Sequence, residues 1–382
     1  MNAEIHPVDR SAEERVRSLL RTAPLIDGHN DLPLVILNDE ASKGDVRHYD
    51  LTSIHPESDT DIPRWKDGQI GMQVLAAFTD GRVENPAVRT LELIDVVRQI
   101  WERHPETVRP VLSASDIMDA MDEKKIGVML AVEGGVGMEH SLAALRCWHG
   151  LGMRLMTLCH NKSLHWVDSA TDSPVANGLS AFGADVIREL NRLGVIVDLS
   201  HVAPKAMHDV LDVSRAPVAL SHSNASALCR SPRNVPDDVL DRIAGNGGIV
   251  MATFIPDFVS QAVLDWMAPV RTRFAATMGA AARSALLAEH EKDYGPRPRA
   301  TLSEVCDHLD YFVDRVGIDH VGIGSDFHGG PVHTTGLEHI GRVRDILVEL
   351  ARRGWSDGDL AKVAGLNFIR VFEAVEKAGA AA

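Results

Sequence analysis

Histidine and carboxylate side chains recur in this sequence at the ends of short apolar runs. Imidazole and carboxylate groups bind divalent metal ions, carry protons and act as acids or bases. The residues concerned are Asp27, His29, Asp31, Glu133, His160, His201, His222 and Asp326. A single one is more simply explained as a hydrogen-bonded structural residue or a helix N-cap. Their recurrence at the ends of six of eight apolar runs favours one shared site.

The spacing within this set predicts a site for two metal ions. His29 and Asp31 are two residues apart, so on a strand both side chains point to the same side and could bind one metal. His201 and His222 follow consecutive apolar runs and could bind a second metal. Glu133 could bridge the two with one oxygen each. Mixed histidine and carboxylate ligands suit Zn²⁺, so we expect two zinc ions per chain.

Such a site predicts hydrolysis of an amide bond. A water bridging two metals becomes hydroxide near neutral pH and can attack a carbonyl carbon. Asp326 has no metal partner in this scheme, so we expect it to move the proton of the water to the leaving amine. His160 is a candidate donor to the oxyanion. In CRSPRNVPDD (229–238), Arg230 and Arg233 are candidates to hold an anionic end of the substrate.

The elements that must position these residues form a repeating pattern. Short, nearly continuous apolar runs, typical of strands buried on both faces, lie at 24–31, 70–79, 126–135, 154–161, 194–201, 217–224, 247–254 and 320–327. Helix-like stretches separate most of them, such as 141–152, 236–248, and 180–194 with Ser180 as N-cap and Gly194 as stop.

Eight such strands alternating with helices predict a (β/α)8 barrel, a single domain over residues 1–382 with insertions at 35–69 and 255–319. The carboxyl ends of barrel strands meet at one mouth, which is why residues three hundred positions apart are expected to converge. A doubly wound open sheet is the competing fold. Its glycine-rich loop is missing, since GIGSDF (322–327) has Phe327 in place of the third glycine.

Composition excludes several classes of protein. With 39 basic and 54 acidic residues the formal charge is −15, which argues against a nucleic-acid partner and against an anionic membrane surface. The amino-terminal residues do not resemble a secretory signal, and no apolar run is long enough for a membrane span. We therefore expect a cytoplasmic protein. HEKDY (290–294) lacks the second histidine of a helix-borne zinc-protease motif.

Ordered together, seven motifs make the chain resemble the membrane (renal) dipeptidases, family M19 of the metallopeptidases within the amidohydrolase-like superfamily. They are DGHND (27–31), EGG (133–135), GMRLMTLCHN (152–161), DLSH (198–201), SHSNA (221–225), RNVPDD (233–238) and the GSDF that precedes His328. The resemblance covers roughly residues 24 to 372. It implies a barrel enzyme that hydrolyses dipeptides, often with a D-residue at the C-terminal position, and that forms a homodimer.

The resemblance also implies a role for each site residue. His29 and Asp31 would bind the first zinc, His201 and His222 would bind the second zinc, and Glu133 would bridge the two. His160 would contact the substrate carbonyl, and Arg233 rather than Arg230 would hold the substrate carboxylate. Asp326 would be the proton shuttle. Two positions depart from the family pattern: His328 stands where an aspartate is common, and Leu34 where an aromatic residue is common.

Two alternatives to a dipeptidase remain open from the sequence. One is a related amidohydrolase that acts on β-lactams or N-acyl amino acids. The other is a barrel that binds ligands without catalysis, which predicts the loss of a metal ligand or of Asp326. All of these residues are present.

Overall fold

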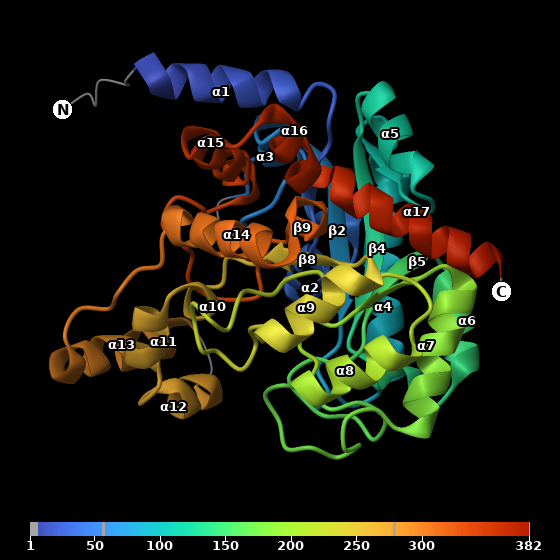
Figure 1. The fold of residues 1–382 in the computed structure, drawn as a ribbon. Coiled ribbons are helices and arrows are strands. Elements are labelled where there is room, and N and C mark those ends of the chain that lie inside the picture. The colour runs from blue at the N-terminus through green and yellow to red at the C-terminus, as the bar shows by residue number, and fades with distance from the viewer. Residues whose placement is uncertain (1–6, 56–57, 278–279, 382) are drawn as a thin grey trace.

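A ring of eight parallel strands forms the centre of the computed structural model, which describes residues 7–55, 58–277 and 280–381. The strands lie in the middle of the molecule (Figure 1). In ring order the strands are β1 (Leu25–Asp27), β2 (Ile70–Phe78), β4 (Ile126–Glu133), β5 (Met153–Thr157), β6 (Ile196–Asp198), β7 (Val218–Leu220), β8 (Ile249–Ala252) and β9 (Val321–Ile323). Each strand pairs in parallel with the next. The predicted barrel and all eight predicted strands are confirmed.

Backbone hydrogen bonds just beyond β9 and β1 bring the two ends of the ring together. The amide of Gly28 donates to the carbonyl of Ile323 at 3.0 Å, and the amide of Asp326 donates to the carbonyl of His29 at 3.1 Å. The buried carboxylate of Asp27 adds a side-chain link, because it accepts from the backbone amide and the hydroxyl of Ser325 at 2.6 and 2.7 Å. This closure places the last predicted site residue beside the first.

One strand, β3 (Val108–Pro110), was not predicted. It pairs with the first residues of β4, with Val108 opposite Ile126, whereas β5 pairs with β4 only from Leu130 onward. Its three residues, Val-Arg-Pro, carry neither an apolar run nor an alternating pattern, so the sequence gives no strand signal there.

Helices surround the ring (Figure 1). Those of the barrel wall and the chain ends are α1 (Pro7–Leu19), α4 (Pro86–Arg103), α5 (Ser115–Asp122), α6 (Leu142–Gly150), α7 (Ala181–Leu193), α8 (Pro204–Val213), α9 (Asp237–Asn246), α14 (Leu302–Val316), α15 (Arg344–Arg352), α16 (Asp357–Ala361) and α17 (Asn367–Ala380). The expected caps of α7 are present: the Ser180 side chain accepts from the amide of Gly183, and Gly194 ends the helix at φ 67°.

Helices also occupy the two segments expected as insertions. Between β1 and β2 lie α2 (Leu32–Asn38), a 3₁₀ helix (Val46–His48) and α3 (Ile62–Asp67). After β8 come α10 (Pro256–Val259), α11 (Gln261–Met267), α12 (Arg271–Ala276) and α13 (Ala280–Tyr294), and α11 to α13 lie to one side of the ring (Figure 1). The division of the chain into one domain with two insertions stays a prediction.

The core has two parts because strand side chains alternate between the inside and the outside of the ring. Inward-facing residues such as Met72, Met129 and Met251 form an interior cluster, to which α17 adds Phe368 and Phe372. Outward-facing strand residues pack against the helices. Burial on both faces explains why the strands are nearly continuous apolar runs. None of the described helices has the length and apolar character needed to cross a membrane.

Candidate metal centre

The predicted metal ligands, together with His160 and Asp326, meet at the carboxyl end of the ring. Glu133 is the last residue of β4, and the others follow the ends of β1, β5, β6, β7 and β9. Their donor atoms form three overlapping groups, each within 4.8 Å: His29, Glu133 and His222; Glu133, His160 and His201; and His29, Asp31 and Asp326. All except the half-buried His160 are buried. The structure therefore brings together every residue that we expected, from the sequence, to bind a metal ion or to donate or carry a proton.

Glu133 lies between the histidines and presents one oxygen to each side. Its Oε2 is 3.3 Å from Nε2 of His29, and its Oε1 is 3.0 Å from Nε2 of His201 and 3.5 Å from Nε2 of His222. Burial raises the pKa of Glu133, but the charge of His29 and the contacts from His201 and His222 outweigh it and hold that pKa well below its ordinary value. The group is a carboxylate with its two oxygens divided between two sets of histidines.

Several of these donor atoms are buried without a hydrogen-bond partner among the described residues. They include Nε2 of His29, Oδ1 of Asp31 and Nε2 of His222. Unpaired buried polar atoms are rare in folded proteins because each one loses its hydration. Here the unpaired atoms converge, and they are imidazole nitrogens and carboxylate oxygens, the donor types that bind Zn²⁺ and similar ions. The residues present fit a metal site.

His222 is oriented from behind by a chain of two side chains. Its Nδ1 is 2.7 Å from Oγ of Ser221, and the Ser221 hydroxyl donates to Oδ2 of Asp198 at 2.6 Å. A serine hydroxyl has one proton, so Nδ1 of His222 must be the donor to Ser221. Nε2 then carries the lone pair and faces Glu133, which is the form a metal ligand needs.

Sequence reasoning gave no role to Ser221 or Asp198, although both lie in the motifs that carry the resemblance. Asp198 ends β6 and is fully buried, and it also accepts from the hydroxyl of Thr157 at 2.5 Å and from the amide of Ser221 at 2.9 Å. Two features of the sequence could have indicated that Ser221 and Asp198 orient His222. Ser221 directly precedes the candidate ligand His222, and Asp198 lies within the preceding apolar run.

The backbone is left-handed at three residues of the site. His201, Asp326 and His328 have φ values of 70°, 64° and 69°. Each costs a non-glycine residue about 1 to 2 kcal/mol, and such strain gathers at functional sites. Gly329 is required next to them, since a Cβ there would lie 2.1 Å from Oδ1 of Asp326.

Burial, reinforced by Asp31 and Glu133, raises the pKa of Asp326 well above its ordinary value against the charge of His29.

His160 borders the site from the loop after β5. Its ring lies 4.2 Å from the ring of Phe78, and burial lowers its pKa to about 4, so the imidazole is neutral near pH 7. The loop is held in place from within, because Asp168 accepts hydrogen bonds from the amides of Val175, Ala176 and Gly178. A neutral imidazole on a fixed loop can donate one hydrogen bond to a substrate oxygen.

Arg233 is the arginine that the structure places at the centre, whereas Arg230 is exposed. The Arg233 side chain is buried, with 3% of its surface exposed, and packs over the ring of Phe258 at 5.2 Å. Its Nη2 donates to the carbonyl of His222 at 3.3 Å, while Nε and Nη1 have no partner among the described residues. A buried guanidinium with two unpaired nitrogens suits a carboxylate, which binds it through two oxygens.

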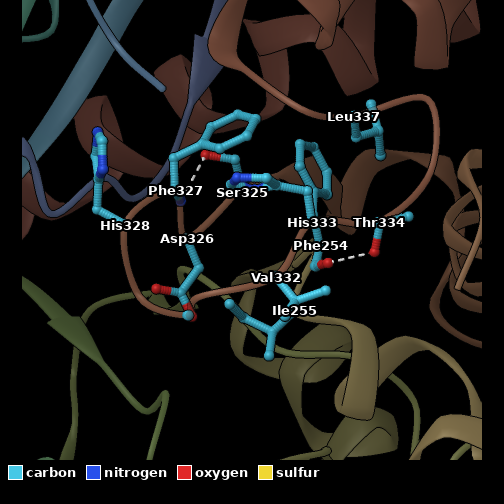
Figure 2. A pocket seen from close by; sticks show the side chains of 11 residues that line it. Phe254, Ile255, Ser325, Asp326, Phe327, His328, Val332, His333, Thr334 and Leu337 are labelled. Carbon is cyan, nitrogen blue, oxygen red and sulfur yellow. Dashed lines mark hydrogen bonds between the residues drawn. The ribbon is translucent and has the colours of Figure 1, made fainter. Parts of the chain in front are cut away.

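A cavity of about 160 Å³ opens beside the metal centre, and Phe258, which packs against Arg233, forms part of its lining. Its lining residues are Asp31, Leu34, Phe78, Glu133, His160, Asn161, His201, Ile255, Phe258, Asp326, His328 and Gly329. A smaller pocket adjoins it behind Asp326 and His328, whose side chains point in different directions (Figure 2). His328 turns its ring to the segment before β2, with Nδ1 3.6 Å from Oδ2 of Asp59 and Nε2 3.5 Å from Oγ of Ser58.

Comparison with known proteins identifies relatives along nearly the whole chain. The family model described as membrane dipeptidase, peptidase family M19, matches residues 13–382. Dipeptidase tcpJ of Claviceps purpurea is 38% identical over 79% of this chain and 64% of its own length. An uncharacterized dipeptidase of Schizosaccharomyces pombe is 34% identical over 96% of this chain and 84% of its own length.

Solved structures share the fold. The probable dipeptidase PvdM from Pseudomonas aeruginosa superposes with a TM-score of 0.83 at 26% identity, covering 97% of this chain and 99% of that one. A metallopeptidase from Rhodobacter sphaeroides, solved with a phosphinate mimic of the dipeptide L-Ala-D-Ala, gives a TM-score of 0.77 at 22% identity, with 93% of this chain and 99% of that one covered.

Proposed function

Because the chain belongs to the membrane dipeptidase family, peptidase family M19, and is thus a hydrolase of peptide bonds, we propose that it is a dipeptidase with two zinc ions. The observation that carries this proposal is the division of the two Glu133 oxygens between His29 on one side and His201 and His222 on the other. The dipeptide mimic bound to the Rhodobacter relative supports the substrate class, including a D-residue at the C-terminal position.

The proposed ligands follow from the same geometry. His29 and Asp31 would hold one zinc, His201 and His222 the other, and Glu133 would bridge them. When bound, such ions acidify water and polarise a carbonyl oxygen. Burial and the charge of His29 lower the pKa of His222 to about 3, so this imidazole is already neutral, as a ligand must be. Burial also lowers the pKa of His29, but Glu133 and Asp31 outweigh it and raise that pKa well above its ordinary value, so a metal ion bound at His29 would displace a proton.

The remaining groups would orient the substrate and move protons. Arg233 would bind the free carboxylate of the dipeptide through Nε and Nη1. His160 would donate a hydrogen bond to the carbonyl oxygen as it gains negative charge. Asp326 would accept a proton from the attacking water and give it to the departing nitrogen. The carbon–nitrogen bond breaks, hydroxyl adds to the carbonyl carbon, and a carboxylate and a free amine result.

A stereochemically defined dipeptide panel on zinc-loaded protein tests the proposal. We expect about two zinc ions per chain and hydrolysis of dipeptides with a free carboxylate, with little hydrolysis of C-terminal amides. The panel includes a β-lactam and an N-acyl amino acid, the alternatives left open by the sequence. The dipeptidase assignment would be disproved if zinc-loaded protein hydrolysed the β-lactam or the N-acyl amino acid but no dipeptide. It would also be disproved if this protein hydrolysed no substrate at all. A homodimer and a cytoplasmic location stay predictions.

A further inference from the structure

The cavity beside the metal centre has two apolar walls. Leu34, from α2, and Phe78, at the end of β2, form the first wall. Ile255, directly before α10, and Phe258, within α10, form the second wall. All four side chains are only half-buried, so they present apolar surface to a solvent-accessible cavity. Such surface next to a polar centre is what the apolar groups of a ligand cover when they bind.

The two walls lie near different parts of the centre. Phe78 contacts His160, with ring centroids 4.2 Å apart, whereas the ring of Phe258 lies 5.2 Å from the guanidinium of Arg233. Phe78 ends β2 and Arg233 follows β7, and these strands are four places apart in the ring of eight, on opposite sides of the barrel. A substrate that spans from one side to the other would reach both walls.

The rest of the lining has no charge to offer a substrate side chain. Asn161 and Gly329 are uncharged, and both ring nitrogens of His328 face Asp59 and Ser58 rather than a bound ligand. The other lining groups are Asp31, Glu133, His160, His201 and Asp326, which belong to the centre itself. A charged side chain placed between the walls would lose hydration and gain no counter-charge from the described lining residues.

We propose that the enzyme selects dipeptides in which both side chains are uncharged and small to medium aliphatic. With its carboxylate on Arg233, the substrate places the side chain of its C-terminal residue against Ile255 and Phe258. The side chain of the N-terminal residue lies against Leu34 and Phe78. The cavity of about 160 Å³ is smaller than the roughly 300 Å³ at which pockets for drug-sized ligands begin, which favours compact side chains. This inference rests on the proposed dipeptidase activity, because that activity fixes the orientation of the substrate.

Shape-matched substrates test the selectivity on the unaltered protein. Aspartate and leucine side chains have similar outlines and differ in charge, so Leu-Ala is compared with Asp-Ala, and Ala-Leu with Ala-Asp. We expect kcat/KM to be about tenfold or more higher for the leucine member of each pair. Equal values within both pairs would overturn the inference and leave the dipeptidase assignment standing. Zinc-loaded protein that hydrolyses no dipeptide would instead disprove the proposed function.

Two substitutions assign each wall to one end of the substrate. Leu34→Lys should raise kcat/KM for Asp-Ala relative to Leu-Ala, and Ile255→Lys should raise it for Ala-Asp relative to Ala-Leu. The matched control is Val88→Lys on α4, where the side chain is 55% exposed and does not line the cavity. Zinc content and circular dichroism verify folding of each variant. The assignment of the walls would be contradicted if Leu34→Lys favoured Ala-Asp and Ile255→Lys favoured Asp-Ala. The same change of preference in Val88→Lys would also contradict it.

Discussion

Replacing Ser221 by alanine should weaken zinc binding although Ser221 does not contact the metal site directly. In the structure Nδ1 of His222 donates to Oγ of Ser221 at 2.7 Å, and that hydroxyl donates to Asp198 at 2.6 Å. Ser221→Ala removes both bonds. The imidazole then loses the partner that keeps its proton on Nδ1, and it can place the proton on Nε2, the atom that faces Glu133.

The expected magnitude follows from the role of such supporting groups. Loss of a hydrogen-bond partner behind a ligating histidine lowers metal affinity by about 10- to 100-fold, which corresponds to about 1.4 to 2.8 kcal/mol. Competition with a chromogenic zinc chelator measures the dissociation constant without any need for catalysis. We expect the proposed zinc site of His201 and His222 to be the one affected, because among the described residues only His222 has this hydrogen-bonded serine behind it.

Ser325→Ala is a matched control. The Ser325 hydroxyl also donates to a buried strand-end carboxylate, Asp27, at 2.7 Å, and it also lies at the carboxyl end of the ring. Its other hydrogen-bond partners are the backbone carbonyl of His29 at 3.1 Å and the backbone amide of Phe327 at 3.3 Å, and no imidazole ring is among them. Both variants should lose comparable folding stability, whereas only Ser221→Ala should lose zinc. An unchanged zinc affinity in Ser221→Ala, or an equal loss in Ser325→Ala, would refute the reasoning.

Four further predictions address the centre and the surface. Glu133→Gln removes the shared negative charge and should reduce bound zinc below two ions per chain, measured by atomic absorption; full zinc content would contradict the bridge. Arg233→Ala should lower kcat/KM for a dipeptide by about 10- to 100-fold and have little effect on its C-terminal amide, so an equal loss on both would remove Arg233 from carboxylate binding. Asp326→Asn should keep its zinc and lower kcat by about 100-fold or more, and unchanged turnover would exclude it as proton carrier. Hydrogen bonds from Arg192 hold the pKa of Glu189 at about 2, below its ordinary value, so this carboxylate stabilises the fold by about 1 kcal/mol above its ordinary pKa and loses that contribution as the pH falls toward 2. Acid unfolding of Glu189→Gln should show a smaller pH dependence than that of the unaltered protein over this range, and an identical one would contradict the pair.

The strands and the donor residues that meet at the centre could be predicted from the sequence because both leave local signals. A strand buried on both faces must be apolar throughout, so each barrel strand is visible by itself as a short apolar run. Residues at the ends of such strands converge in any parallel barrel, which is why the donor set could be named before its geometry was known. The spacing of His29 and Asp31 predicted that their side chains share one side of a strand; the side chains do meet, with Nε2 of His29 3.7 Å from Oδ1 of Asp31, but β1 ends at Asp27 and Asp31 precedes α2, so strand geometry is not what brings them together.

Only the tertiary structure decided which atoms meet. The two oxygens of Glu133 face different histidines because strand register and the left-handed backbone at His201 set the directions of those side chains. Arg233 is buried and Arg230 is exposed although both lie in one short loop of similar composition. The hydrogen bonds behind His222 join β6 to β7, and the closure from β9 to β1 brings Asp326 to His29. The apolar pattern of a segment predicts whether that one strand or helix is buried. The contacts named here depend on how separate elements pack against one another, which no single segment encodes.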